Sequence, residues 1–189
     1  MHCQQRVVKQ CVLLITLIIV GCSTDKQPSA TPLTPVYDPA TGKLQLLIAP
    51  KDSDRDGKVD RWDYYGTDRR LQKFGFSLQH DGKEDAWAYP GPDGTTTRIE
   101  SSPRRNGKIQ RIEHFNHDVL TAAEEDTDGD GKIDKWETFE GPRLAVVAFD
   151  TTHKGVPDRR LVYGDDGSVR IEVDPRGDGH FVESRSPPE

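Results

Sequence analysis

The stretch from Gly131 to Gly155, "GKIDKWETFEGPRLAVVAFDTTHKG", contains one complete period of a repeat that decides the fold. Glycine stands at both ends and again at Gly141, so the period is divided into two segments. Each segment has about eight residues, is rich in β-branched and aromatic side chains, and is bounded by Gly, Asp or Pro. This composition is typical of two β-strands joined by short turns.

The same period extends through most of the chain. Glycines recur at steps of 24 or 25 residues, at Gly57, Gly82, Gly107, Gly131, Gly155 and Gly179. A second set lies between them, at Gly42, Gly66, Gly91, Asn116, Gly141 and Gly164. Asn116 fits this set because Asn is the residue most able to replace Gly at positive φ. Such self-similarity is the mark of a repeat architecture, here with six copies.

These patterns predict an all-β fold over residues 36–184, an antiparallel β-meander of about ten to twelve short strands. We expect an open twisted sheet or a flat sandwich rather than a large barrel. The segment "DVLTAAEE", residues 118–125, is also compatible with a short helix capped by Asp118. We expect six large aromatic side chains to pack together on the buried face: Trp62, Trp87, Trp136, Phe74, Phe76 and Phe149.

The first residues predict export. Arg6 and Lys9 precede an apolar run, residues 12–20, which is shorter than the roughly 20 residues of a membrane-spanning helix but suits a secretory signal. The run ends in Ile19-Val20-Gly21-Cys22, which resembles a bacterial lipobox. The resemblance implies a signal peptide over residues 1–21 and lipidation of Cys22. An uncleaved N-terminal anchor is the alternative.

Residues 22–35 are polar and proline-rich, which predicts a flexible tether, and we expect residues 185–189 to be a disordered tail. Loss of Arg6 and Lys9 with the signal leaves 24 of the 26 basic residues against all 32 acidic ones, a net charge of −8. This charge disfavours nucleic acid as a partner and favours cations. In lipobox proteins, the lack of Asp after the cysteine, here Ser23, implies the outer membrane in a cell that has one.

Two of the acidic turns have the spacing of a calcium site. In "DTDGDGKIDKWE", residues 126–137, oxygen-bearing side chains stand at positions 1, 3, 5, 9 and 12, and Gly131 stands at position 6. The segment "DSDRDGKVDRWD", residues 52–63, has the same pattern. Ca²⁺ takes about six to eight oxygen ligands, which these positions can supply around one ion.

The two segments resemble the calcium loops of EF-hands, dockerins and thrombospondin type 3 repeats. The resemblance implies two Ca²⁺ sites, in which Lys58 and Lys132 contribute main-chain carbonyls. The implied side-chain ligands are Asp52, Asp54, Asp56, Asp60 and Asp63 in the first site, and Asp126, Asp128, Asp130, Asp134 and Glu137 in the second. The resemblance stops short of the EF-hand helices, because Gly66 and Pro142 follow the two segments too closely for a helix of ordinary length.

The four other copies of the turn are poorer in acid. Arg104 and Lys154, for example, stand where a carboxylate would be needed at positions 3 and 5. If acidity served only to solvate turns, all six copies should be similarly acidic. The alternative is that both acidic segments are only turns, since Asp-Gly is a common turn sequence. A zinc site is a poorer candidate, because the only close histidines are His114 and His117, which we interpret as surface turn residues.

No nucleophile motif, phosphate-binding glycine loop or Ser/His/Asp set is visible, so catalysis is not expected. We predict a lipid-anchored, exported calcium-binding repeat protein with a structural or interaction role in the cell envelope. The alternative is a metal-independent surface module that binds a glycan or a partner protein through exposed aromatic residues, namely Tyr64, Tyr65, Trp87 and Tyr89.

Overall fold

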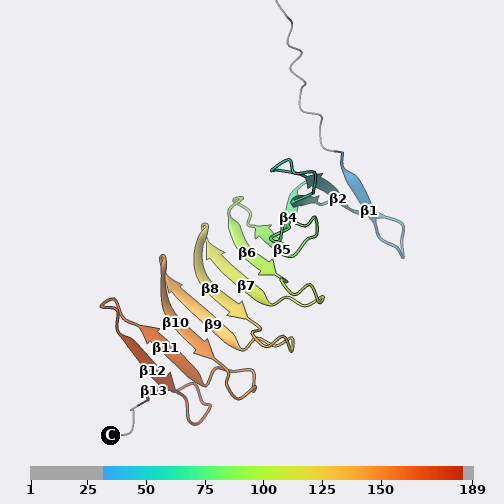
Figure 1. Cartoon of the computed structure of the whole chain (residues 1–189). Coiled ribbons are helices and arrows are strands. Elements are labelled where there is room, and N and C mark those ends of the chain that lie inside the picture. The colour runs from blue at the N-terminus through green and yellow to red at the C-terminus, as the bar shows by residue number, and fades with distance from the viewer. Residues whose placement is uncertain (1–31, 185–189) are drawn as a thin grey trace, which may run out of the picture. The chain divides into compact units, whose positions relative to one another are not determined.

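The computed structural model describes residues 32–184, in which thirteen strands form one antiparallel β-sheet and there is no helix (Figure 1). Neighbours in the sheet are neighbours in the chain, from β1 to β13. The strands are β1 (Thr34–Tyr37), β2 (Leu44–Lys51), β3 (Arg61–Tyr65), β4 (Leu71–Phe76), β5 (Ala86–Pro90), β6 (Thr96–Ser101), β7 (Arg111–Asn116), β8 (Val119–Glu125), β9 (Lys135–Glu140), β10 (Arg143–Phe149), β11 (Arg159–Tyr163), β12 (Val169–Val173) and β13 (Val182–Glu183). The predicted β-meander is confirmed as an open sheet, and the described strands form no sandwich.

The ends of the sheet differ from the prediction. β1 begins at Thr34, inside the segment 22–35 that was expected to be a tether, and it pairs with β2. β1 and the two-residue β13 bring the total to thirteen strands. The predicted signal peptide, Cys22 and residues 185–189 lie outside the described part of the chain. Within that part, no helix is long and apolar enough to cross a membrane.

The segment 118–125 is not a helix but strand β8. Asp118, the expected helix cap, has a φ of 61° and forms a tight turn with His117, whose φ is 49°. Positive φ at both central residues is the geometry of the two-residue hairpin turn whose twist matches the flanking strands. β8 pairs with β7 on one side and with β9 on the other. This pairing outweighs the local helix preference of its alanines.

The two sets of glycines differ in backbone conformation, because only Gly42 and Gly141 of the second set have positive φ. All six glycines of the first set have φ between 81° and 96°, a conformation that suits glycine. In the second set, Gly66 and Gly164 are not at positive φ; a Cβ on either would lie within 2.8 Å of a neighbouring side-chain oxygen. The explanation given for Asn116 was therefore wrong. Asn116 ends β7, and the two residues after it take the positive φ.

The large aromatic residues do not share one face. Phe74 lies opposite Ala88, whereas its chain neighbour Gly75 lies opposite Trp62 and Trp87. Consecutive strand residues point to opposite faces, so the sheet has a phenylalanine face and a tryptophan face. The register places Phe74, Phe76 and Phe149 on the first face and Trp62, Trp87 and Trp136 on the second. All six are half-buried, because the described sheet has no second layer to cover them.

The buried apolar residues are small for the same reason. In a single layer only a short side chain can be covered by its longer neighbours. The buried apolar residues are Ala49, Ala86, Ala88, Ala123, Ala145, Val147 and Ala148.

An ion pair on the phenylalanine face covers one of these small residues, Ala123. Arg111 on β7 bonds Glu137 on β9 at 2.8 Å, so the pair crosses the intervening strand β8. Ala123 on β8 lies opposite Glu137 on the same face and is only 1% exposed. The space above Ala123 is therefore taken by a charged bridge rather than by an apolar layer.

We predict that Ala123→Leu destabilises the sheet by about 1–3 kcal/mol, because the larger side chain must displace the Arg111–Glu137 bridge. Ala122→Leu is the matched control, since Ala122 is half-buried and faces the opposite side of the same strand. Urea unfolding of both variants measures the difference. Equal stability of the two variants would contradict the assigned bridge.

Candidate metal centres

The connections at one end of the strands are long and follow one plan. We call them loop A (residues 52–60), loop B (77–85), loop C (102–110), loop D (126–134), loop E (150–158) and loop F (174–181). In loops B to F, the main-chain N–H of the first residue donates to the carbonyl of the ninth residue of the preceding loop, at 2.7–3.0 Å. The ladder of the sheet thus continues into the loops and stacks them side by side.

Loop D shows how the acidic side chains organise a loop. The Asp126 carboxylate, 2% exposed, accepts the N–H groups of Gly129 at 2.6 Å and Gly131 at 2.9 Å. Asp134 accepts the N–H of Thr127 at 3.0 Å and its hydroxyl at 2.8 Å. Burial raises the pKa of Asp126, but the two glycine N–H groups outweigh it and hold that pKa below its ordinary value of 3.8. Asp126 is therefore an anion at neutral pH.

The structure brings together three of the predicted carboxylates in each acidic loop. Carboxylate oxygens within 4.8 Å of one another come from Asp126, Asp128 and Asp134 in loop D, and from Asp52, Asp54 and Asp60 in loop A. These are positions 1, 3 and 9 of the predicted pattern. The first residue of loop D is buried, whereas Asp52 is exposed, because loop A has no preceding loop in the row.

The carboxylates at position 5 accept hydrogen bonds from main-chain N–H groups of their own loop. Asp56 accepts the N–H of Lys58 at 2.8 Å, and Asp130 accepts the N–H of Lys132 at 2.7 Å. These bonds fix the chain at position 7, whose carbonyl was predicted as a ligand.

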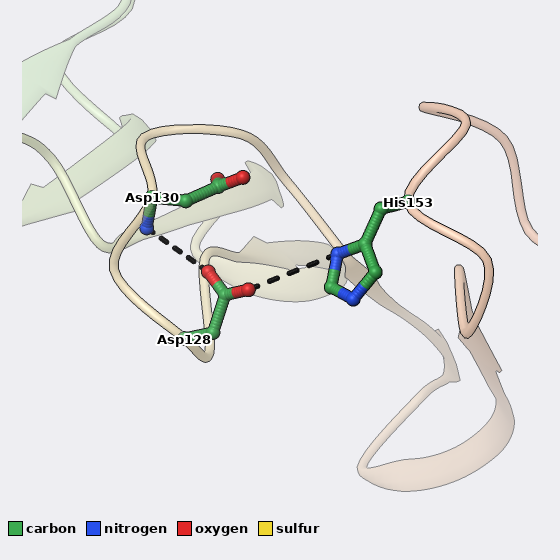
Figure 2. Close-up of side chains that lie close together, drawn as sticks. All are labelled: Asp128, Asp130 and His153. Atoms are coloured by element: carbon green, nitrogen blue, oxygen red, sulfur yellow. Dashed lines mark hydrogen bonds and ion pairs between the residues drawn. The ribbon is translucent and has the colours of Figure 1, made fainter.

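Asp130 also belongs to a second group, shown in Figure 2, in which Asp128 and His153 are its partners. His153 comes from loop E, and its Nδ1 lies 3.8 Å from Asp128 Oδ2. Sequence reasoning missed this residue. The repeat period was the available signal, because a step of 25 residues leads from Asp128 to His153 in the next loop.

The position-12 residues, Asp63 and Glu137, do not join these groups. They lie in β3 and β9, and each is held by cations of the sheet. Asp63 accepts from Arg61 at 2.6 Å and from Lys51, while Glu137 accepts from Arg111 and Lys135, both at 2.8 Å. Burial raises the pKa of both carboxyls, but these cations outweigh it and hold each pKa below its ordinary value.

Loop C supplies positive charge to loop D. The Arg104 guanidinium donates to the Thr127 carbonyl at 2.7 Å, and Lys108 Nζ donates to the Asp130 carbonyl at 2.6 Å. Both cations bind main-chain carbonyls and leave the three converging carboxylates to face one another. The loop D carboxylates are thus only partly compensated by protein charge.

Of the two histidines predicted as surface turn residues, only one lies in a turn. His117 lies in the β7–β8 turn, but His114 is a residue of β7 and lies 3.2 Å from Glu124. They form no metal-binding group among the described residues.

Comparisons with known proteins add little. No protein-family model and no curated protein matches the chain. A solved structure of accessory secretory protein 1, 2 and 3 in Streptococcus pneumoniae aligns with 62% of this chain at 15% identity, with a TM-score of 0.28. The chain spans 19% of the length of that matched chain, and a likeness this low carries no argument about function.

Proposed function

We propose that this chain is a lipid-anchored, exported protein whose loops A and D each bind one Ca²⁺, and that it has a structural or interaction role in the cell envelope. One observation carries the calcium proposal: among six loops of one plan, these two each gather three carboxylates within 4.8 Å. Carboxylate oxygens are the ligands that Ca²⁺ prefers, and the ion tolerates irregular geometry. Mg²⁺ is a poorer candidate, because it requires near-ideal octahedral geometry and dehydrates reluctantly.

In this proposal the side-chain ligands are the carboxylates at positions 1, 3 and 9. Position 5 and the carbonyl at position 7 lie in the same loops and complete the set, with water in any remaining place. Position 12 contributes nothing, since its carboxylates already neutralise sheet cations. Like charges held this close destabilise the empty loop, so a bound cation stabilises the folded chain by linkage.

The anchor and the location are proposed on the sequence alone. Acylation of Cys22 would hold the chain at a membrane, because each buried methylene contributes about 0.8 kcal/mol and two or more chains anchor stably. The outer membrane is the proposed site in a cell that has one. An envelope bathed in millimolar calcium suits loops with the weak affinity of extracellular calcium modules.

The alternative, a metal-independent module with an aromatic binding face, has weaker support. A concavity of about 550 Å³ on the tryptophan face is lined by Tyr64, Tyr89 and Lys73 among others. However, Lys73 Nζ lies 4.7 Å from the centre of the Tyr64 ring, and the Tyr64 hydroxyl bonds Glu84. The Tyr89 hydroxyl likewise bonds Glu100 at 2.8 Å. These aromatic groups are already engaged within the chain, which leaves less of them for a sugar or a partner.

Calcium titration of the full chain, kept soluble in detergent, tests the proposal. We expect two sites with dissociation constants of about 10⁻⁴–10⁻³ M. Calcium at ten millimolar should then raise the free energy of unfolding by about 1.4–2.7 kcal/mol for each site. Calorimetry and thermal unfolding measure the two effects. An absence of heat, with an unfolding temperature indifferent to calcium and chelator, would refute it.

Asp126→Asn should remove one of the two sites, and Asp150→Asn is its matched control. Both carboxylates open a loop, are buried, and accept the N–H of the sixth-position glycine. They differ in that loop E has Thr152 and Lys154 where loop D has acids at positions 3 and 5. Both variants should lose some stability in chelator, but only Asp126→Asn should lose calcium binding.

Glu137→Gln distinguishes a position-12 ligand from a sheet residue. We expect calcium affinity to be unchanged and stability to fall by about 1–3 kcal/mol at neutral pH, because Arg111 and Lys135 each lose one of their charged partners. The pKa of Glu137 is lower in the folded chain than its ordinary value of 4.5. The stabilisation is thus complete above that value, and the gap between wild type and variant should close as pH falls below it. Urea unfolding between pH 3 and pH 7 measures this, and a loss of calcium affinity would show that Glu137 is a ligand after all.

A further inference from the structure

The carboxylates of loop B are bonded by a positively charged side chain of the protein itself. The guanidinium of Arg105, from loop C, bonds both carboxylate oxygens of Asp81, with Nη2 at 2.9 Å from Oδ1. The same Nη2 lies 2.7 Å from Asp85 Oδ2 and 3.3 Å from the Lys83 carbonyl. The Asp85 side chain is 0% exposed, so its carboxylate has no contact with bulk water. Arg105 is thus the cationic partner of this buried carboxylate.

The three groups that bond Arg105 occupy defined positions of the repeated loop. Asp81, the Lys83 carbonyl and Asp85 stand at positions 5, 7 and 9 of loop B. The same positions in loop D are Asp130, the Lys132 carbonyl and Asp134, which belong to the proposed calcium ligands. A guanidinium therefore bonds the groups that correspond to cation ligands in loop D.

The backbone explains how Arg105 reaches loop B. Position 4 has positive φ in every long loop, at Arg55, His80, Arg105, Gly129, His153 and Gly177. From this position two side chains reach the preceding loop: Arg105 reaches Asp81, and His153 lies beside Asp128. Because Arg55 and His80 share this positive φ, it belongs to the plan of the loops rather than to the Arg105 contact.

The electrostatics of Asp81 agree with this arrangement. Its bond to Arg105 lowers the pKa of Asp81 to about 2. Without Arg105, loop B would hold two carboxylates that no cation of the chain contacts, one of them fully buried, because Arg105 makes the only ion pairs found for Asp81 and Asp85 among the described residues. An isolated buried charge is strongly destabilising.

We infer that Arg105 is the resident cation of loop B and that it excludes divalent ions from this loop. The inference rests on the proposed function in so far as loops A and D take the ion that Arg105 replaces. The role of Arg105 as counter-ion stands on its own contacts. Loop C, which has no acid, would then serve two neighbours: Arg105 neutralises loop B, and Arg104 and Lys108 approach loop D.

A double-mutant cycle in chelator tests the counter-ion role without calcium. In the wild-type chain, Asp85→Asn should lower the unfolding temperature, because it removes one of the two carboxylate charges that pair with Arg105. In the Arg105→Ala background the same substitution should raise the unfolding temperature, because it removes an unpaired buried charge. Arg104→Ala is the matched control background, since Arg104 contacts loop D instead. An effect of one sign in all three backgrounds would overturn the inference.

A second arm tests the exclusion of metal. Calorimetry counts the calcium sites of the wild-type chain and of Arg105→Ala. The variant should bind one calcium ion more than the wild type, whatever number the wild type binds. An equal count in the two chains would overturn the exclusion. If Arg105→Ala does not fold, Arg105→Lys keeps the charge without the planar fork, and it should be less stable than wild type and bind no additional ion.

Discussion

The hydrogen bond from the first residue of each long loop to the ninth residue of the loop before it is the constraint on which the rest of this molecule depends. It carries the pairing of the strands into the loops, so the loops are stacked at close to the strand spacing of about 4.8 Å. Charged side chains in adjacent loops are then within a few ångströms of one another. No loop can be charged independently of its neighbours, and the charge of an acidic loop is offset by a cation from a neighbouring loop or from solution.

The strands of the sheet likewise depend on contacts with adjacent strands for their stability. Without a covering layer, no large side chain among the described residues is removed from water by an apolar core, and the buried apolar residues are alanines and one valine. Stability has to come from backbone pairing and from contacts between side chains on adjacent strands. The bridges made by Asp63 and Glu137 are such contacts, and the Glu137 bridge lies above Ala123, which it shields. This explains why the acid at position 12 of the calcium-loop pattern pairs with cations of the sheet rather than joining the carboxylates of the loop.

The loops therefore combine two kinds of construction. The first nine residues follow the plan of a cation-binding turn, in which carboxylates accept N–H groups of their own loop. The tenth residue begins a strand, and from there side chains alternate between the faces of the sheet. In an EF-hand a helix brings the twelfth residue back to the ion, whereas here the strand directs it to the phenylalanine face. A site of the proposed kind would have fewer protein ligands and would suit weak binding of a common ion.

The sequence by itself determined the repeat, the all-β class and the meander, because the glycine period and the alternation of side chains are local signals. It also located the two acidic loops, and three of the five acids in each have carboxylate oxygens within 4.8 Å of one another. It could not assign the aromatic residues to faces, since a shift of one residue in register exchanges the two faces. Local preference also failed for residues 118–125, where pairing on both sides made a strand of an alanine-containing segment. Only the tertiary structure decided which cation accompanies which carboxylate, because Arg105, His153 and Arg111 act across 20 to 26 residues of chain, and their partners are set by the stacking of loops and strands.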